Sequence, residues 1–226
     1  KRGSTRESKA RYLIMSLEPE ESLKRLLKLR DGAERILKTR ENTQIEFKQS
    51  FNLGSMPEYA RTMVAFANAE GGFIVYGVRN SPRELIGVNH ERFESIDPAK
   101  VTSFLNAHCS PELQWDMGTI EFGGVRLGYL YTHSHFRKPV IVTTTSGKEL
   151  KEGEIYYRYR GQTTTIRFAE LRTLIDALLD QERRGWLQHL STISKAGAMN
   201  VAVLDTLQGK LFGAGAPFLI DEALLR

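Results

Sequence analysis

The stretch AFANAEGGFIVYGV, residues 65–78, constrains the fold more than any other part of the sequence. It joins a helical pattern to an apolar strand through two glycines, whose permissive backbone can end a helix and turn the chain. The strand part, FIVYGV, is apolar almost throughout and has no face suited to water. It therefore predicts a central strand that is buried on both faces of a sheet.

The helix before this strand is predicted to begin near residue 56. Residues 55–58, Ser-Met-Pro-Glu, fit a capping box, in which the serine and glutamate side chains satisfy free backbone N–H groups. Apolar residues at i, i+4, i+7 and i+8 then form one stripe that faces the core. The stripe consists of Tyr59, Met63, Phe66 and Ala67. We expect Asn68 to serve the tight turn into the strand.

Further patterns predict the other elements of the same domain. Strands are expected at IEFKQSF, KPVIV and EIYYRYR, a hairpin at TIEF-GG-VRLGYLYTH, a helix from Asp97-Pro98, and a last helix at AELRTLIDALLDQER. Helices and strands in this order indicate an α+β domain, with helices packed on a mixed sheet, over residues 38–182.

Two flanking regions complete the chain. Residues 1–37 are expected to form a basic arm and then one or two helices that start at Pro19 and break near Asp31-Gly32. Their basic face, with Lys24, Arg25, Lys28 and Arg30, is interpreted as solvated. Residues 183–226 are expected to be a separate extension, which begins at Gly185-Trp186. It ends in FLIDEALLR, an uncapped apolar helical start that predicts a fragment of a longer protein.

Composition narrows the classes of function. The net charge of +5 allows a polyanionic partner. The single cysteine, Cys109, rules out an internal disulfide framework and favours a reducing, cytoplasmic location. We read neither a signal peptide nor a membrane span, and the pair His133 and His135 lacks a third zinc ligand. Zinc is therefore not expected as a cofactor. The sequence also lacks the G-x-x-x-x-G-K-[ST] motif, so ATP is not expected either.

Several motifs in combination resemble the Schlafen-type AlbA domain family. They are Glu41-x4-Glu46-Phe47-Lys48, AFANAEGGFIVYGV, KPVIV and GEIYYRYRGQTTT, and the resemblance covers about residues 41–182. It implies an Alba-like α+β fold and nucleic-acid binding. In several members it also implies metal-dependent endoribonuclease activity on structured RNA such as tRNA. The activity is associated with three acidic positions, which correspond here to Glu41, Glu46 and, in place of an aspartate, Asn80.

The two glutamates have a chemical role if they converge. Carboxylates can hold Mg²⁺ or Mn²⁺, which activates a nucleophile next to a phosphate, and Asn80 would weaken such a site by removing one negative charge. Glu84 could replace that charge if its loop folds back. Five residues of separation fit neither one strand face nor one helix face, so Glu41 and Glu46 meet only if ENTQ bends back. The alternative is that Glu46 only pairs with neighbouring charges.

A second set of residues is suited to nucleic-acid backbone contacts. Arg158 and Arg160 alternate with Tyr157 and Tyr159, so the two arginines should share one strand face and could straddle phosphates. The alternative is a solvated face above a buried aromatic one. Weaker candidates are Lys48, Arg79, Arg137 and Lys138.

These patterns lead to two hypotheses about function. The first is a cytoplasmic module that binds nucleic acid, with RNA favoured over DNA, and that cleaves structured RNA with a divalent metal at Glu41 and Glu46. The alternative is a noncatalytic DNA- or RNA-binding or assembly module of a larger regulatory or defence protein. Family members with two such halves enclose RNA between them, so this single half is expected to form a homodimer.

Overall fold

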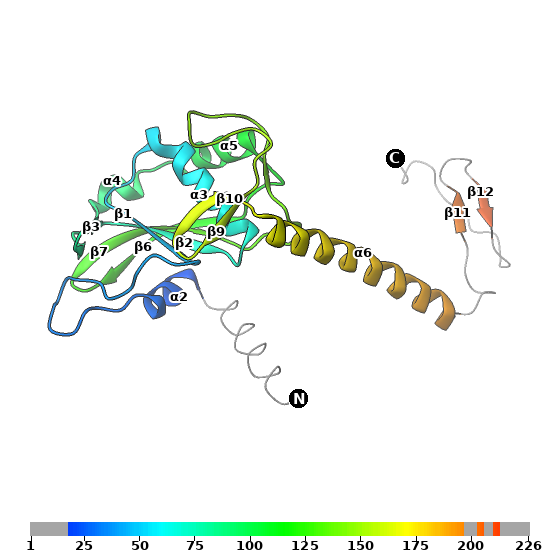
Figure 1. Cartoon of the computed structure of the whole chain (residues 1–226), viewed down its shortest axis with the longest axis horizontal. Helices are drawn as coiled ribbons and strands as arrows, with labels where there is room; N and C mark the ends of the chain where they lie inside the picture. The colour runs from blue at the N-terminus through cyan, green and yellow to red at the C-terminus, as the bar shows by residue number, and fades with distance from the viewer. Residues whose placement is uncertain (1–17, 197–202, 206–209, 213–226) are drawn as a thin grey trace. The chain divides into compact units, whose positions relative to one another are not determined.

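The computed structural model of the chain describes residues 18–196, 203–205 and 210–212 (Figure 1). The described residues divide after Leu171 into two compact units. The predictions for the basic arm and for the end of the tail fall outside these residues. No helix in the described part of the chain is both long and apolar enough to cross a membrane.

A four-stranded mixed sheet forms the centre of the first unit, in the order β1-β2-β7-β6. Strand β1 (Ile45–Lys48) runs parallel to β2 (Gly72–Tyr76). Strand β7 (Val125–Thr132) lies antiparallel to β2 and to β6 (Trp115–Phe122). All residues of β2 are buried, as expected for an apolar strand between two neighbours. The α+β class and the central strand are therefore confirmed.

Helices cover both faces of this sheet (Figure 1). One face carries α3 (Met56–Asn68), α4 (His90–Glu94) and α5 (Pro98–His108), and the other carries α2 (Pro19–Leu26). Two clusters of buried apolar residues lie between these layers. The predicted stripe of α3 is buried in the first cluster, which confirms it.

Shorter elements complete the two units. The 3₁₀ helix η1 (Leu53–Ser55) precedes α3. Three two-stranded pairs belong to the first unit and one to the second. They are β3 (Val78–Asn80) with β4 (Arg83–Leu85), β5 (Cys109–Ser110) with β8 (Ile141–Val142), β9 (Tyr156–Tyr159) with β10 (Gln162–Thr165), and β11 (Val203–Asp205) with β12 (Lys210–Phe212).

Of the N-terminal caps predicted for α3 and α5, one is confirmed and the other is wrong. Asp97 caps α5 as predicted, because its carboxylate accepts a hydrogen bond from Ala99 N at 2.9 Å. The capping box at Ser55 is wrong, since this side chain makes no capping hydrogen bond. The 3₁₀ turn places Ser55 in a nearly helical conformation, and Asn52 caps Gly54 N instead.

Close contacts explain why glycine occupies the two positions that follow α3, Gly71 and Gly72. Gly71 has a φ of +82°, and a Cβ there would lie 2.8 Å from Thr132 O. A Cβ on Gly72 would lie 2.5 Å from the Phe66 ring. Asn68 does more than serve this turn. Its side chain donates to Val140 O and Tyr156 O and accepts from Val140 N, which ties α3 to two distant segments.

Residues 27–38 correct one prediction, because they do not continue as a second helix. The chain turns at Asp31-Gly32, where Gly32 has a φ of +75°. It then runs back beside itself, so that Lys38 N donates to Lys28 O at 2.8 Å and Leu37 pairs with Leu29. Leu37 is buried in the second apolar cluster from an extended backbone, which its helical spacing with α2 did not indicate.

Helix α6 (Phe168–Ala196) corrects a second prediction. It runs without a break through Gly185 and Trp186, where a separate tail was expected to begin. A single glycine in a helix interior costs only about 1 kcal/mol relative to alanine, which the surrounding strong helix formers offset. Several of its apolar residues are exposed.

Candidate functional site

The predicted bend before β1 is present. Asn42 N donates to Ile45 O at 3.1 Å, and the Asn42 side-chain oxygen accepts from Gln44 N and Ile45 N at 2.7 and 3.1 Å. An asparagine that caps its own following turn is a common local device. The bend carries Glu41 back along β1, next to the strand that contains Glu46.

The returning side chain of Glu41 covers the free edge of β1. This strand pairs only with β2, so the backbone groups on its other side need partners. Glu41 Oε1 accepts from Phe47 N at 3.0 Å, and Ile45 O accepts from Arg158 Nη2 at 2.9 Å. The first glutamate of the E-x4-E element therefore has a structural role at a sheet edge.

Glu46 lies between two cations on the face of the sheet that α3 covers. Its Oε1 is 2.9 Å from Lys48 Nζ, and its Oε2 is 2.6 Å from Arg158 Nη2. The second contact is an ion pair without a well-directed hydrogen bond, and Arg158 Nη2 also donates to Ile45 O. The side chains of Glu46 and Arg158 are 13% and 1% exposed, so this pair is shielded from water.

Lys48 links Glu46 to helix α3. Its ammonium group lies 2.8 Å from Glu58 Oε1 as well as close to Glu46. Burial alone would lower the pKa of Lys48, but hydrogen bonds and charge attraction from Glu58 and Glu46 outweigh it and raise that pKa. Lys48 therefore stays charged and pairs with both glutamates, and its nucleic-acid contact stays a prediction.

Asn80, the third predicted position, lies on β3 and its role stays a prediction. It is exposed in the β3–β4 hairpin, opposite Arg83, and no hydrogen bond joins it to Glu41 or Glu46. Glu84, the predicted substitute, pairs with Arg79 at 2.8 Å. Across residues 18–196 and the two short strands that follow, no three His, Cys, Asp or Glu side chains are placed to hold a metal ion. The predicted Mg²⁺ or Mn²⁺ site at Glu41 and Glu46 thus finds no support in this geometry.

The two arginines of IYYRYRG are placed differently from the prediction. Arg158 points inward with Tyr156, and its guanidinium lies 5.3 Å from the Phe66 ring. It also donates to Asn42 O and to Thr163 Oγ1. We therefore withdraw Arg158 as a phosphate contact. Arg160 is exposed in the β9–β10 turn, so its predicted role stays a prediction.

The other predicted cations are also distributed rather than clustered. Arg137 is exposed and lies over the Phe136 ring at 5.6 Å. Lys138 Nζ donates to Ala69 O at the end of α3, and burial lowers the pKa of Lys138. The nucleic-acid contacts of these two residues stay predictions.

The two histidines are not a pair on one solvent-facing side. His133 Nε2 is 2.6 Å from Asp116 Oδ2 at an exposed position. His135 is buried, and its Nδ1 contacts the backbone of Arg137. The two rings therefore have different surroundings.

Another basic surface lies between Lys24 and Arg40 and includes Arg25, Lys28 and Arg30, which were interpreted as solvated. Between Lys24 and Arg40 the sequence has seven lysines and arginines and two acids. Lys24 and Lys38 pair with Glu21 and Asp31. The remaining five are exposed and have no acidic partner in the described part of the chain. We call these five the basic segment: Arg25, Lys28, Arg30, Arg35 and Arg40.

The basic segment is held on an ordered backbone. Leu37 N donates to Arg83 O and Leu85 N to Arg35 O, at 2.8 and 2.7 Å, so the segment extends the β3–β4 hairpin. This hairpin also carries the predicted residue Arg79. The signal available in the sequence was the local charge excess. The missing information was that residues 28–40 fold back and present their charges from a hairpin.

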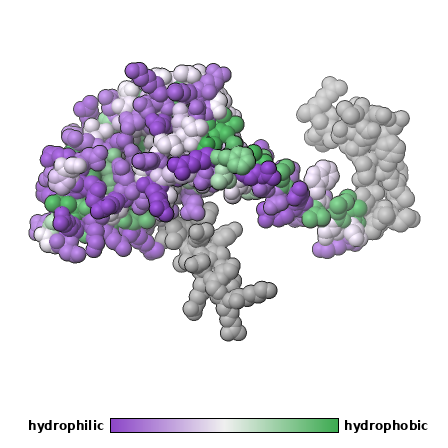
Figure 2. Space-filling view, in the orientation of Figure 1, coloured by the Kyte–Doolittle hydropathy of each residue, from purple (hydrophilic) through white to green (hydrophobic). Residues whose placement is uncertain are grey.

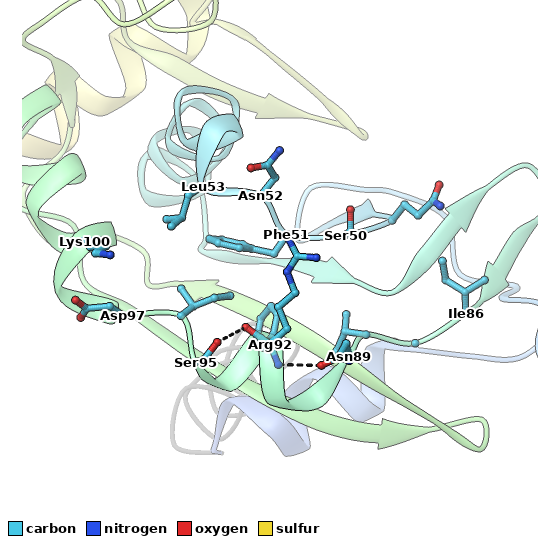
Figure 3. A pocket seen from close by; sticks show the side chains of 15 residues that line it. Ser50, Phe51, Asn52, Leu53, Ile86, Asn89, Arg92, Ser95, Asp97 and Lys100 are labelled. Carbon is cyan, nitrogen blue, oxygen red and sulfur yellow. Dashed lines mark hydrogen bonds between the residues drawn. The ribbon is translucent and has the colours of Figure 1, made fainter.

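A cavity of about 640 Å³ lies at the end of β1, beside α4 and α5 (Figure 3). Its wall includes Phe51, Asn52, Asn89, Arg92 and Lys100. Figure 3 shows Arg92 reaching toward the loop that carries Ser50 and Phe51. Neither Arg92 nor Lys100 has an acidic partner among the described residues, so this cavity is suited to an anionic ligand.

The sheet, the helices on its two faces and the capped edge of β1 define an α+β domain in the first unit. The sequence profile of the Schlafen, AlbA_2 family matches residues 41–167, more than half of the chain. The chain belongs to this family. The predicted resemblance is confirmed.

Similar proteins extend the comparison. An uncharacterized ATP-binding protein of Ureaplasma parvum is 37% identical over an alignment of 202 residues, with 83% of this chain and 56% of that protein covered. The chain thus spans little more than half of the relative's length.

Two solved structures are also similar. A Corynebacterium diphtheriae protein has 12% identity and a TM-score of 0.43, with 74% of this chain and 27% of that chain covered. The N-terminal domain of a RecG-related protein from Nitrosomonas europaea has 22% identity and a TM-score of 0.34, with 57% and 85% covered. Both TM-scores are below 0.5, too low for either structure to indicate function.

One prediction about cofactors needs correction. The missing phosphate-binding motif led to the expectation that ATP has no role. The name of the Ureaplasma relative, an ATP-binding protein, contradicts this expectation. A sequence motif excludes one architecture of nucleotide site, and other architectures bind phosphates through separate cations.

Proposed function

We propose that this chain is a nucleic-acid-binding module whose main contact surface is the basic segment. The observation that carries the proposal is the set of five exposed cations without acidic partners. Phosphate backbones bind such cations through release of condensed counterions, without any need for base contacts. Membership of the Schlafen AlbA_2 family is compatible with this assignment.

The support comes from charge and order together. The hydrogen bonds from Leu37 N to Arg83 O and from Lys28 N to Thr39 Oγ1 fix both arms of the hairpin. Cations on a fixed backbone lose less conformational freedom when they bind than cations on a disordered arm. By contrast, Lys48 and Arg158 both form ion pairs with Glu46.

Binding to fluorescent RNA hairpins and DNA duplexes tests the proposal. A variant with Lys28, Arg30 and Arg35 replaced by glutamine should bind both about tenfold or more weakly, because three phosphate contacts are lost. The control replaces three cations outside the basic segment, Arg126, Lys148 and Arg172, of which Arg126 is half-buried and the other two are exposed. Equal weakening in both variants would contradict the assignment.

RNA cleavage at Glu41 and Glu46 stays a prediction that this geometry does not favour. One carboxylate caps Phe47 N and the other is neutralised by two cations. Incubation of the protein with total tRNA, with and without Mg²⁺, tests the prediction. Cleavage by the parent that disappears in Glu46→Gln, while the variant remains folded and still binds RNA, would support it.

A second candidate function is nucleotide binding in the cavity beside α4 and α5. The observation in its favour is the cavity with two unpaired cations, Arg92 and Lys100, and the aromatic ring of Phe51. Its volume of about 640 Å³ lies in the range of small-molecule sites. The Ureaplasma relative is named for ATP binding.

Calorimetric titration with ATP tests this candidate separately from nucleic acid. The double variant Arg92→Ala, Lys100→Ala should lose ATP binding, whereas Arg126→Ala, Lys148→Ala should retain it. ATP binding that survives the first variant, or no binding by the parent, would remove this cavity from consideration.

A further inference from the structure

Helix α6 exposes large apolar side chains along most of its length. Ile175, Leu179, Trp186 and Leu190 are 41%, 49%, 68% and 57% exposed. Figure 2 shows hydrophobic residues at the surface of this helix. A helix of 29 residues is about 43 Å long, and a solitary helix of this kind gains no stability from packing its apolar side. The exposed side therefore suggests a missing partner.

The four residues form one stripe. Their spacings of four, seven and four residues, at about 100° per residue, place them within an arc of about 60°. Ile193 continues the stripe at one end, 43% exposed. Charged residues flank it, with Glu182 near its centre. The stripe thus has the form of a contact surface for another helix.

Charge is distributed unevenly between the two halves of α6. The half from Phe168 to Glu182 has four acids and one arginine, and the half from Arg183 to Ala196 has three cations and no acid. The acids are Glu170, Asp176, Asp180 and Glu182, and the cations are Arg183, Arg184 and Lys195. A partner helix should carry the opposite order of charge when it lies alongside.

We propose that α6 pairs in antiparallel orientation with α6 of a second copy of this chain. The two-fold axis passes between Glu182 and Arg183. Ile175 and Leu190 lie equally far from this point, and so do Leu179 and Trp186. An isologous contact about this axis brings the stripe onto itself and sets each acidic half beside the partner's basic half.

The charge pattern selects the orientation. A parallel pair would place acidic half against acidic half and basic half against basic half, which is unfavourable. The antiparallel pair also sets Glu182 of one copy level with Arg183 of the other, so the charge at the centre of the stripe has a partner. This contact does not depend on the proposed nucleic-acid binding.

The oligomeric state of the full chain tests the existence of the contact. Light scattering should give twice the mass of one chain for the parent and for Gln188→Asp, and the mass of one chain for Leu190→Asp. Gln188 lies on the side of α6 opposite the stripe, so the two variants introduce the same charge at matched positions. Circular dichroism should show unchanged helix content. A monomeric parent, or a dimer that survives Leu190→Asp, would overturn the proposal.

Cysteine cross-linking tests the orientation. A mixture of Ile175→Cys and Leu190→Cys chains should form an interchain disulfide, whereas neither variant alone should. Cys109 is buried and gives little background. Efficient self-cross-linking of Ile175→Cys alone would show a parallel pair and contradict the antiparallel assignment.

Discussion

The guanidinium of Arg158 lies 2.6 Å from the carboxylate of Glu46, and both side chains are largely withdrawn from water. This contact joins β9 to β1. The same guanidinium donates to Ile45 O and Asn42 O, so it also holds the edge strand and the bend before it. The glutamate that sequence reasoning placed in a catalytic site is thus part of a buried network.

Replacement of Arg158 should therefore destabilise the folded protein. Arg158→Leu leaves Glu46 with only Lys48, removes the donor to Asn42 O, and leaves Ile45 O with only the hydrogen bond from Asn42 N. We expect a loss of about 3 kcal/mol in the free energy of unfolding, measured by urea denaturation. Arg160→Leu, two residues further and exposed, should change it by less than about 0.5 kcal/mol. Similar effects of both substitutions would contradict the structural role of the pair.

Loss of the Glu41 side chain should expose one specific amide. In Glu41→Ala, Phe47 N loses its acceptor at the free edge of β1. Hydrogen exchange should therefore speed up at Phe47, while Val75 in the central strand stays protected. The expected loss of stability is about 1 to 2 kcal/mol. Unchanged exchange at Phe47 would show that Glu41 does not cap this edge in solution.

Replacement of Asn68 should reduce stability far more than replacement of an exposed asparagine. It is fully buried, and its amide makes three hydrogen bonds to Val140 and Tyr156. Asn68→Ala leaves all three backbone groups unpaired, for an expected loss of about 3 kcal/mol or more in thermal or urea unfolding. Asn106→Ala, at an exposed position, is the control and should have little effect. Comparable losses would argue against the cross-link.

Cys109 should behave as an inert thiol in the folded protein. Burial raises the pKa of Cys109 from 9.0 to about 12. Its contribution to stability is complete below pH 9 and is lost as the pH rises toward 12, because only the unfolded thiol ionises in this window. The parent should lose about 1.4 kcal/mol more than Cys109→Ala per pH unit there. Equal pH dependence would contradict the raised pKa.

Sequence patterns predicted the core of this fold well, since apolar spacing reports burial directly. FIVYGV became the central strand β2, and Tyr59 and Phe66 face the core from α3. Asp97 caps α5 as expected. The bend that returns Glu41 to β1 was also anticipated, because five residues of separation allow no other approach.

The interior position of Arg158 could not be read from alternation alone. Tyr156 and Arg158 share one strand face, and only the presence of Glu46 and Phe66 on other elements makes that face the inner one. Likewise, Asp31-Gly32 marked a turn in residues 28–40, but their pairing with the β3–β4 hairpin involves Arg83, which is distant in sequence. Contacts between remote segments decided both cases.

The salt dependence of nucleic-acid binding tests the central claim most directly. The slope of log K against log salt counts phosphate contacts, at about 0.9 per contact on duplex DNA. We predict that replacing Lys28, Arg30 and Arg35 by glutamine reduces the magnitude of this slope by about 2.7, whereas the Arg126, Lys148 and Arg172 replacement leaves it unchanged. The same slope in the parent and in both variants would contradict the assignment of the basic segment as the nucleic-acid surface.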